Sequence, residues 1–154
     1  MRKFAHFACA ALLLTLSAYA APQNPPEEKK APAPRVLKVK LAYNGAGTVD
    51  DNHKIIVFLF DSPDFAQGGV MPIGGQAGAA KNATVTFSDV SASPVYVVTV
   101  FDPKGEYDGQ SGPPPSGSSL GVYTKTPPKP EPVVIDPGKT VEIELPFDDS
   151  FKMP

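Results

Sequence analysis

Proline and glycine restrict what this chain can fold into more than any other feature of its sequence. The 154 residues include 19 prolines and 13 glycines, which punctuate nearly every segment after the first twenty residues. Proline removes a backbone N–H and breaks helix interiors, and glycine weakens them. No window in this part of the chain repeats apolar residues at spacings of three and four over more than two turns. We therefore expect no helix after residue 20, only short extended segments joined by turns.

The N-terminus has the three parts of a secretory signal peptide. Arg2 and Lys3 give a positive start, an apolar run extends from Phe7 to Leu16, and Ala18-Tyr19-Ala20 has the small-x-small pattern of a cleavage site. The apolar run is about half the roughly 20 residues that a membrane-spanning helix needs. We predict a signal peptide over residues 1–20, no membrane span in the mature chain, and a periplasmic or secreted location.

Residues 21–34 are predicted to be a Pro-rich disordered linker. Five prolines lie between Pro22 and Pro34, and the segment shows no apolar periodicity. Two interpretations remain open for it, a tail left after processing and a spacer that holds the domain away from a surface.

Cysteine and charge exclude several classes of function. Cys9, the only cysteine, lies within the predicted apolar core of the signal peptide, so the mature chain has neither disulfides nor a thiolate site. Without Arg2 and Lys3 the chain has 12 Lys and Arg against 16 Asp and Glu, a net charge of about −4. Because nucleic-acid binding needs clustered basic residues, no nucleic-acid partner is expected.

Six short runs carry the signal of β-strands separated by turns. Three of them alternate apolar and polar residues, as Leu37, Val39 and Leu41 alternate with two lysines, which predicts one buried and one exposed face. Two others are apolar on both faces, as central strands are. The runs lie near 37–41, 55–60, 84–87, 95–101, 133–135 and 141–145, and Asp136-Pro137-Gly138-Lys139 predicts a type I or II turn before the last one.

This pattern predicts a nearly all-β fold, a single antiparallel β-sandwich of about six or seven strands over residues 35–147, followed by a C-terminal tail over 148–154. Two long Gly/Pro-rich interruptions, 66–82 and 107–132, are expected to be loops that are either functional or disordered. The second has room for an additional edge strand at 120–123.

The order of the segments 58–65, 83–90 and 96–102 resembles the prealbumin-like sandwiches, which include transthyretin-like and carboxypeptidase regulatory-like domains, and especially small secreted bacterial proteins of that arrangement. The resemblance implies a fold rather than an activity. Prealbumin-like hydroxyisourate hydrolases resemble one another in a histidine and arginine cluster closed by a C-terminal Tyr-Arg-Gly-Ser. This chain ends Phe151-Lys152-Met153-Pro154, so that activity does not carry over.

The mature chain offers no recognisable catalytic constellation, so we expect it not to be an enzyme. Its one histidine, His53, follows Asp50-Asp51-Asn52 in a turn-forming run, and nothing in the sequence pairs it with a nucleophile.

Asp102, Glu106 and Asp108 are the candidate metal ligands, because calcium is held by several loop oxygens at short spacing. Against calcium, Lys104 occupies a slot where a ligand is expected and Gly105 is one place early for a calcium loop. The alternative is a plain turn at the end of a strand. Asp61 and Asp64 with Asp148-Asp149 form either a second acidic patch or solubilising charge.

The sequence favours an exported, non-catalytic interaction or structural module of the bacterial envelope, whose long Gly/Pro-rich loops contact another envelope protein or a surface. A small-ligand or calcium-binding sandwich is the alternative. A transthyretin-like enzyme is the third hypothesis, and its motifs are absent.

Overall fold

The computed structural model describes residues 32–67 and 69–154, which form a nearly all-β unit. The predicted signal peptide and most of the predicted linker lie outside the described residues. The seven strands are β1 Val36–Tyr43, β2 Ile55–Phe60, β3 Gly74–Gly78, β4 Thr84–Phe87, β5 Tyr96–Phe101, β6 Ser119–Val122 and β7 Thr140–Phe147.

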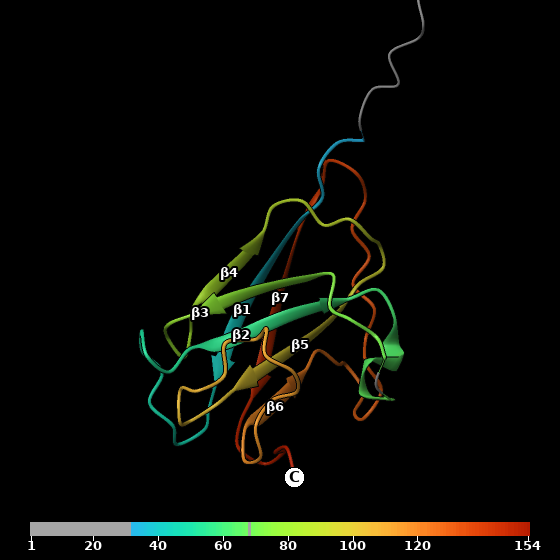
Figure 1. Ribbon diagram of the computed structural model, residues 1–154. Helices are drawn as coiled ribbons and strands as arrows, with labels where there is room; N and C mark the ends of the chain where they lie inside the picture. Colours follow the sequence, from blue (N-terminus) through green and yellow to red (C-terminus); the bar gives the residue numbers. More distant parts are fainter. Residues whose placement is uncertain (1–31, 68) are drawn as a thin grey trace, which may run out of the picture. The chain divides into compact units, whose positions relative to one another are not determined.

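The strands form two sheets, one with the order β4-β1-β7 and one with the order β3-β2-β5-β6. Figure 1 shows β1 and β7 behind β2 and β5, with the strands of the two sheets crossing in this view. This arrangement is compatible with the predicted β-sandwich.

The core lies between the two sheets. Leu37, Val39 and Leu41 of β1 are fully buried there, and their lysine neighbours face outward, as the alternation predicted. Ile55 and Val57 of β2 meet them from the other sheet. The apolar strands β2 and β5 are central in their sheet, which confirms the prediction made from their two-sided hydrophobicity.

The prediction of an antiparallel sandwich was wrong for one strand pair. β7 runs parallel to β1 in an eight-residue register from Val36↔Thr140 to Tyr43↔Phe147, while the other pairs are antiparallel. The reason is that β7 returns after the whole second sheet has been built, and its insertion beside β1 needs no tight hairpin. Alternation in the sequence specifies the buried face of a strand and leaves its direction open.

The interruption 66–82 was predicted to be a loop, and this prediction was wrong over part of its length. Residues 74–78 form the edge strand β3, which pairs with β2 from Leu59↔Gly74 to Ile55↔Gly78. The sequence Gly-Gly-Gln-Ala-Gly has almost no side chains to show a period of two, so it gave no strand signal. In the second interruption, β6 confirms the predicted edge strand near residues 120–123.

Two further predictions need correction. The run 133–135 makes a single antiparallel bridge, Val95↔Val133, and no strand. The described part also contains 3₁₀-helical turns over Pro63–Gln67, interrupted by a kink at Asp64, where no helix was expected. None of the helices in residues 32–67 and 69–154 has the length and hydrophobicity to cross a membrane.

The predicted turn at 136–139 is confirmed. Lys139 N–H donates to the Asp136 carbonyl at 3.0 Å, and Gly138 has a φ of 76°, which makes the turn type II.

Candidate functional site

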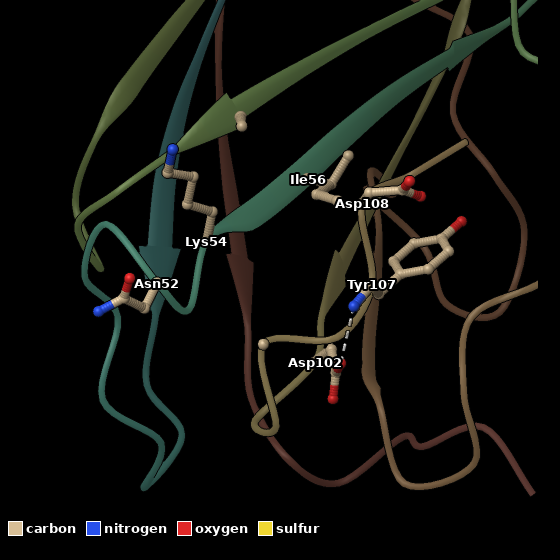
Figure 2. A pocket seen from close by; sticks show the side chains of 8 residues that line it. Asn52, Lys54, Ile56, Asp102, Tyr107 and Asp108 are labelled. Carbon is tan, nitrogen blue, oxygen red and sulfur yellow. Dashed lines mark hydrogen bonds between the residues drawn. The ribbon is translucent and has the colours of Figure 1, made fainter. Parts of the chain in front are cut away.

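A shallow groove lies on the outer face of the four-stranded sheet. It consists of two adjoining cavities of about 290 and 240 Å³, which share Ile56, Ala77 and Asp108 in their linings. One wall is the backbone-rich strand β3, at Gly75 to Ala77, and the other is the segment 105–110. Figure 2 shows the first cavity, with Ile56 between Lys54 on one side and Tyr107 and Asp108 on the other.

The apolar residues at the bottom of the groove are buried: Ile56 is 8% exposed and Phe58 is 7% exposed. Successive side chains of a strand alternate between faces, so Ile56 and Phe58 point away from the main core and form a second cluster with Val100. The Tyr107 ring lies 6.4 Å from the Phe58 ring, centroid to centroid. From Phe58 the aromatic row continues through Phe60, at 6.5 Å, to Phe65, which stacks on Phe60 at 5.1 Å. This apolar strip consists of residues 56, 58 and 60 of β2 and of residue 65 in the 3₁₀ segment that follows.

Asp102 fixes the segment that forms the second wall. Its buried carboxylate accepts three backbone hydrogen bonds, from Lys104 at 2.9 Å, Glu106 at 2.8 Å and Tyr107 at 3.0 Å. Short aspartate side chains compete with water for turn amides in this way at strand ends. The side chain of Asp102 therefore helps to hold the segment after β5, which forms one wall of the groove.

Asp108 continues this wall with a local network. Its carboxylate accepts backbone hydrogen bonds from Gln110 at 2.8 Å and Ser111 at 2.9 Å, and a third from the Ser111 hydroxyl. The Gln110 amide and the Ser111 side chain hold the pKa of Asp108 below its usual value. The pKa of Tyr107 is raised, first by burial and then by the charge of Asp108.

The turn before β2 closes one end of the groove. Asp50 accepts hydrogen bonds from the backbone of Asn52 and His53 and pairs with the His53 ring at 2.9 Å, which lowers the pKa of Asp50. A Cβ built at Gly105 would lie 2.6 Å from the Asn52 carbonyl oxygen, so this turn and the 102–108 segment touch. His53 lies in a turn, as expected.

The structure brings together two of the three predicted metal ligands. Asp102 and Asp108 line the same cavity, while Glu106 is exposed and stands outside that lining. Both aspartates already accept backbone hydrogen bonds, the arrangement of a strand-ending turn. Among residues 32–67 and 69–154, no group of three or more His, Cys, Asp or Glu is placed to hold a metal ion. The calcium site stays a prediction.

A second polar network was missed by the sequence analysis. Tyr43 and Ser119 each donate a hydroxyl hydrogen bond of 2.6 Å to the same oxygen of Asp149, and Ala46 N–H donates to its other oxygen at 2.9 Å. These three donors lower the pKa of Asp149 to about 2. Burial and the Asp149 hydrogen bond raise the pKa of Tyr43 to about 12. No motif marks residues this far apart in sequence, so only folding reveals the network.

This network changes the interpretation of the predicted tail. Backbone hydrogen bonds join Leu120 to Phe151, and Ser118 and Gly117 to Met153, so residues 151–153 lie along β6. Asp149 is a structural anchor here. Two other residues of the predicted second acidic patch accept hydrogen bonds from near neighbours. Asp148 accepts them from Ser150, and Asp64 accepts one from the Gln67 side chain at 3.1 Å.

Fold and groove together define a class of protein, a two-sheet, nearly all-β protein with a shallow groove on an outer sheet face. No protein-family model matches the chain, no curated protein matches it, and no solved structure matches it.

Proposed function

We propose that this chain is an exported, non-catalytic interaction module that receives a partner in the groove over Ile56 and Phe58. The observation that carries the proposal is the convergence of the two Gly/Pro-rich interruptions on this groove: β3 comes from 66–82, and Tyr107 to Gln110 come from 107–132. Loops on a rigid sheet scaffold are where such folds place recognition.

Two structural features support binding rather than chemistry. The groove presents exposed backbone at Gly75, and the apolar residues Ile56 and Phe58 lie beneath it with little of their surface exposed. Its charged lining residues are Lys54, Asp102 and Asp108, and both carboxylates already serve as turn acceptors.

The finer assignments belong to the same proposal. The paired sheets, with β2 and β5 central, support a β-sandwich of the prealbumin-like type, and the pattern of residues 1–20 supports export to the periplasm or beyond.

A capture experiment tests the proposed function. Ala77→Arg fills the groove from an exposed position that lines both cavities. Ala80→Arg adds the same charge three residues later, at an exposed position outside the groove lining. We expect Ala77→Arg to abolish capture of a partner from envelope extract and Ala80→Arg to retain it, with both variants showing wild-type melting. Equal capture by the two variants would show that the groove is not part of the binding surface.

A further inference from the structure

We propose that the open edge of β3 binds the same edge of a second copy of this chain, in an antiparallel pairing about Gln76. The inference goes beyond the proposed function, because it concerns the backbone edge of β3, whereas the groove lies on the outer face of the sheet. It follows from the strand pairing, the charge and the exposed apolar residues of this edge.

β3 is an edge strand with one side open. It is the first strand in the order β3-β2-β5-β6, and among the described residues β2 is the strand with which it pairs. In the same residues, the backbone hydrogen bonds outside the strand ladders involve none of residues 74–78. Gly75, Gln76 and Ala77 are exposed. A row of exposed N–H and C=O groups without partners is a template for a further strand.

The edges on the opposite side of the two sheets are protected. Residues 151–153 lie along β6 and form backbone hydrogen bonds with it. β7 contains Glu142, Glu144 and Pro146, all of them exposed. Coverage, charge and proline are devices by which natural sheets prevent pairing between edges. The sequence of β3, Gly-Gly-Gln-Ala-Gly, contains neither a charge nor a proline, so its edge can accept a strand.

The sequence around this edge is almost free of charge. Between Asp64 and Asp89 the chain has one charged residue, Lys81. Its ammonium group donates to the Gly45 carbonyl at 2.7 Å and lies 5.2 Å from the centre of the Tyr43 ring, so this charge is engaged within the protein. The uncharged stretch also includes β4, the edge strand of the other sheet, and Figure 1 shows β3 and β4 next to each other.

This distribution of charge favours a second copy of the chain as the occupant. The chain has a formal net charge of −2, so two copies repel each other over most of their surfaces. The repulsion is weakest where neither copy presents a charge, which is the edge formed by β3 and β4.

Exposed apolar side chains lie directly before β3. Met71 is 77% exposed and Ile73 is 36% exposed. If Gln76 of one copy faces Gln76 of the other, an antiparallel pairing brings Met71 and Ile73 of one copy beside Ala79 and Ala80 of the other. The pairing therefore covers apolar surface that a single copy leaves in water, and this burial adds to the backbone hydrogen bonds.

The pairing is self-complementary. A two-fold axis at Gln76 sets Gly74 opposite Gly78 of the second copy and Gly75 opposite Ala77 of the second copy. Side chains this small let the two backbones approach each other without steric hindrance. The result is a closed pair in which the two four-stranded sheets join into one continuous sheet.

Sedimentation equilibrium of the purified chain tests the proposal. The chain is expressed at full length, so that any signal cleavage takes place before purification. We expect the measured mass to rise from monomer towards dimer between about 5 µM and about 500 µM, because short edge pairings belong to the weak class of interfaces. A monomer at every concentration would overturn the second copy as the occupant, and masses beyond the dimer would overturn the closed pair.

Charged substitutions at Gln76 test the position of the two-fold axis. Gln76→Lys and Gln76→Glu each place two like charges at the centre of the pair, so each variant alone should associate at least about 10-fold more weakly than the wild type. An equimolar mixture of the two variants sets opposite charges against each other and should restore association, which also shows that both variants are folded.

Thr140→Lys is the matched control for these substitutions. It adds a charge at an exposed position of the edge strand β7 and should leave the association within about 2-fold of the wild type. A mixture of the two Gln76 variants that fails to associate, or an equal loss of association in Thr140→Lys, would overturn the pairing about Gln76.

Hydrogen exchange of the unaltered chain gives a second test. The amides of residues 74–78 that point away from β2 should exchange at least about 3-fold more slowly at the high concentration than at the low one, while the amides of β7 exchange equally at both. Equal exchange in residues 74–78 would overturn the pairing through β3. These measurements contain no partner protein, so their failure is distinct from a failure of the groove in the capture experiment.

Discussion

The Tyr43 hydroxyl donates a 2.6 Å hydrogen bond to Asp149, 106 residues further along the chain. Tyr43 ends β1, and Asp149 follows β7, the parallel neighbour of β1. Ser119 of β6, in the other sheet, donates to the same carboxylate oxygen. One side chain therefore links both sheets at this end of the fold.

This link predicts how stability depends on pH. The pKa of Asp149 falls from 3.8 to about 2 on folding, so its contribution is complete above about pH 4 and is lost as the pH drops towards 2. The pKa of Tyr43 rises from 10.0 to about 12, so its contribution is complete below pH 10 and is lost as the pH rises through 12. Urea melts across this range should show a plateau between the two losses.

Asp149→Ala tests the link directly. The substitution leaves the hydroxyls of Tyr43 and Ser119 without their acceptor, and Ser119 is buried, so we expect a loss of about 1–3 kcal/mol in the free energy of unfolding at pH 7. Tyr43→Phe should reduce the alkaline loss, of which the part due to Tyr107 remains. Part of the acid loss should also remain, because Ser119 and Ala46 still donate to Asp149. An unchanged alkaline melt in Tyr43→Phe would contradict the assignment.

Gly121→Ala should destabilise the contact between β6 and β7. A Cβ at residue 121 would lie 2.7 Å from the Cβ of Phe147 and closer still to the Thr99 hydroxyl oxygen. Overpacking of this kind costs about 1–3 kcal/mol. Gly75→Ala is the matched control, because its Cβ would meet Phe58 at an ordinary 3.6 Å. Chemical denaturation of both variants checks the difference, and equal stabilities would contradict the close packing.

Asp102→Ala should loosen the groove wall without unfolding the protein. Three amides lose their acceptor, so hydrogen exchange at Lys104, Glu106 and Tyr107 should accelerate at least 10-fold, while the amides of β1 keep their protection. Asp61→Ala, at an exposed position before the 3₁₀ helix, serves as control. Unchanged exchange at the three amides would show that the wall is held by other contacts.

Calcium titration separates the two interpretations of Asp102, Glu106 and Asp108. In the strand-ending turn, backbone N–H groups donate to both oxygens of Asp102 and to one oxygen of Asp108, whose other oxygen accepts from the Ser111 hydroxyl. We therefore expect no rise in melting temperature with about 5 mM calcium and no fall with a chelator. A calcium-dependent rise that Asp108→Asn abolishes would establish the metal site instead.

Particular residues show how much of the fold could be predicted from the sequence. The alternation of Leu37, Val39 and Leu41 predicted the buried face of β1, because a strand with one face on the core needs that period. The strand β3 was missed because glycine has no side chain to carry the period. Val133 and Ile135 are buried, as strand residues are, yet one bridge to Val95 is their only ladder contact. The apolar run 133–135 was therefore interpreted as a strand because its residues are buried, although they do not pair as a strand.

The candidate site, too, could be predicted from the sequence only in part. Asp102 and Asp108 stood out as carboxylates in one loop, since their spacing is local. The position of these two aspartates opposite β3, and the role of Asp149, depend on contacts between segments that are far apart in the sequence.

By itself the sequence determined that the segment predicted to be the domain, residues 35–147, contains short β-strands with defined inner faces, because side-chain alternation and turn chemistry act over a few residues. Only the tertiary structure decided the parallel pairing of β1 with β7, the groove between β3 and the 105–110 segment, and the Tyr43–Asp149 link. These features arise from pairing and packing between distant segments, which local residue patterns do not encode.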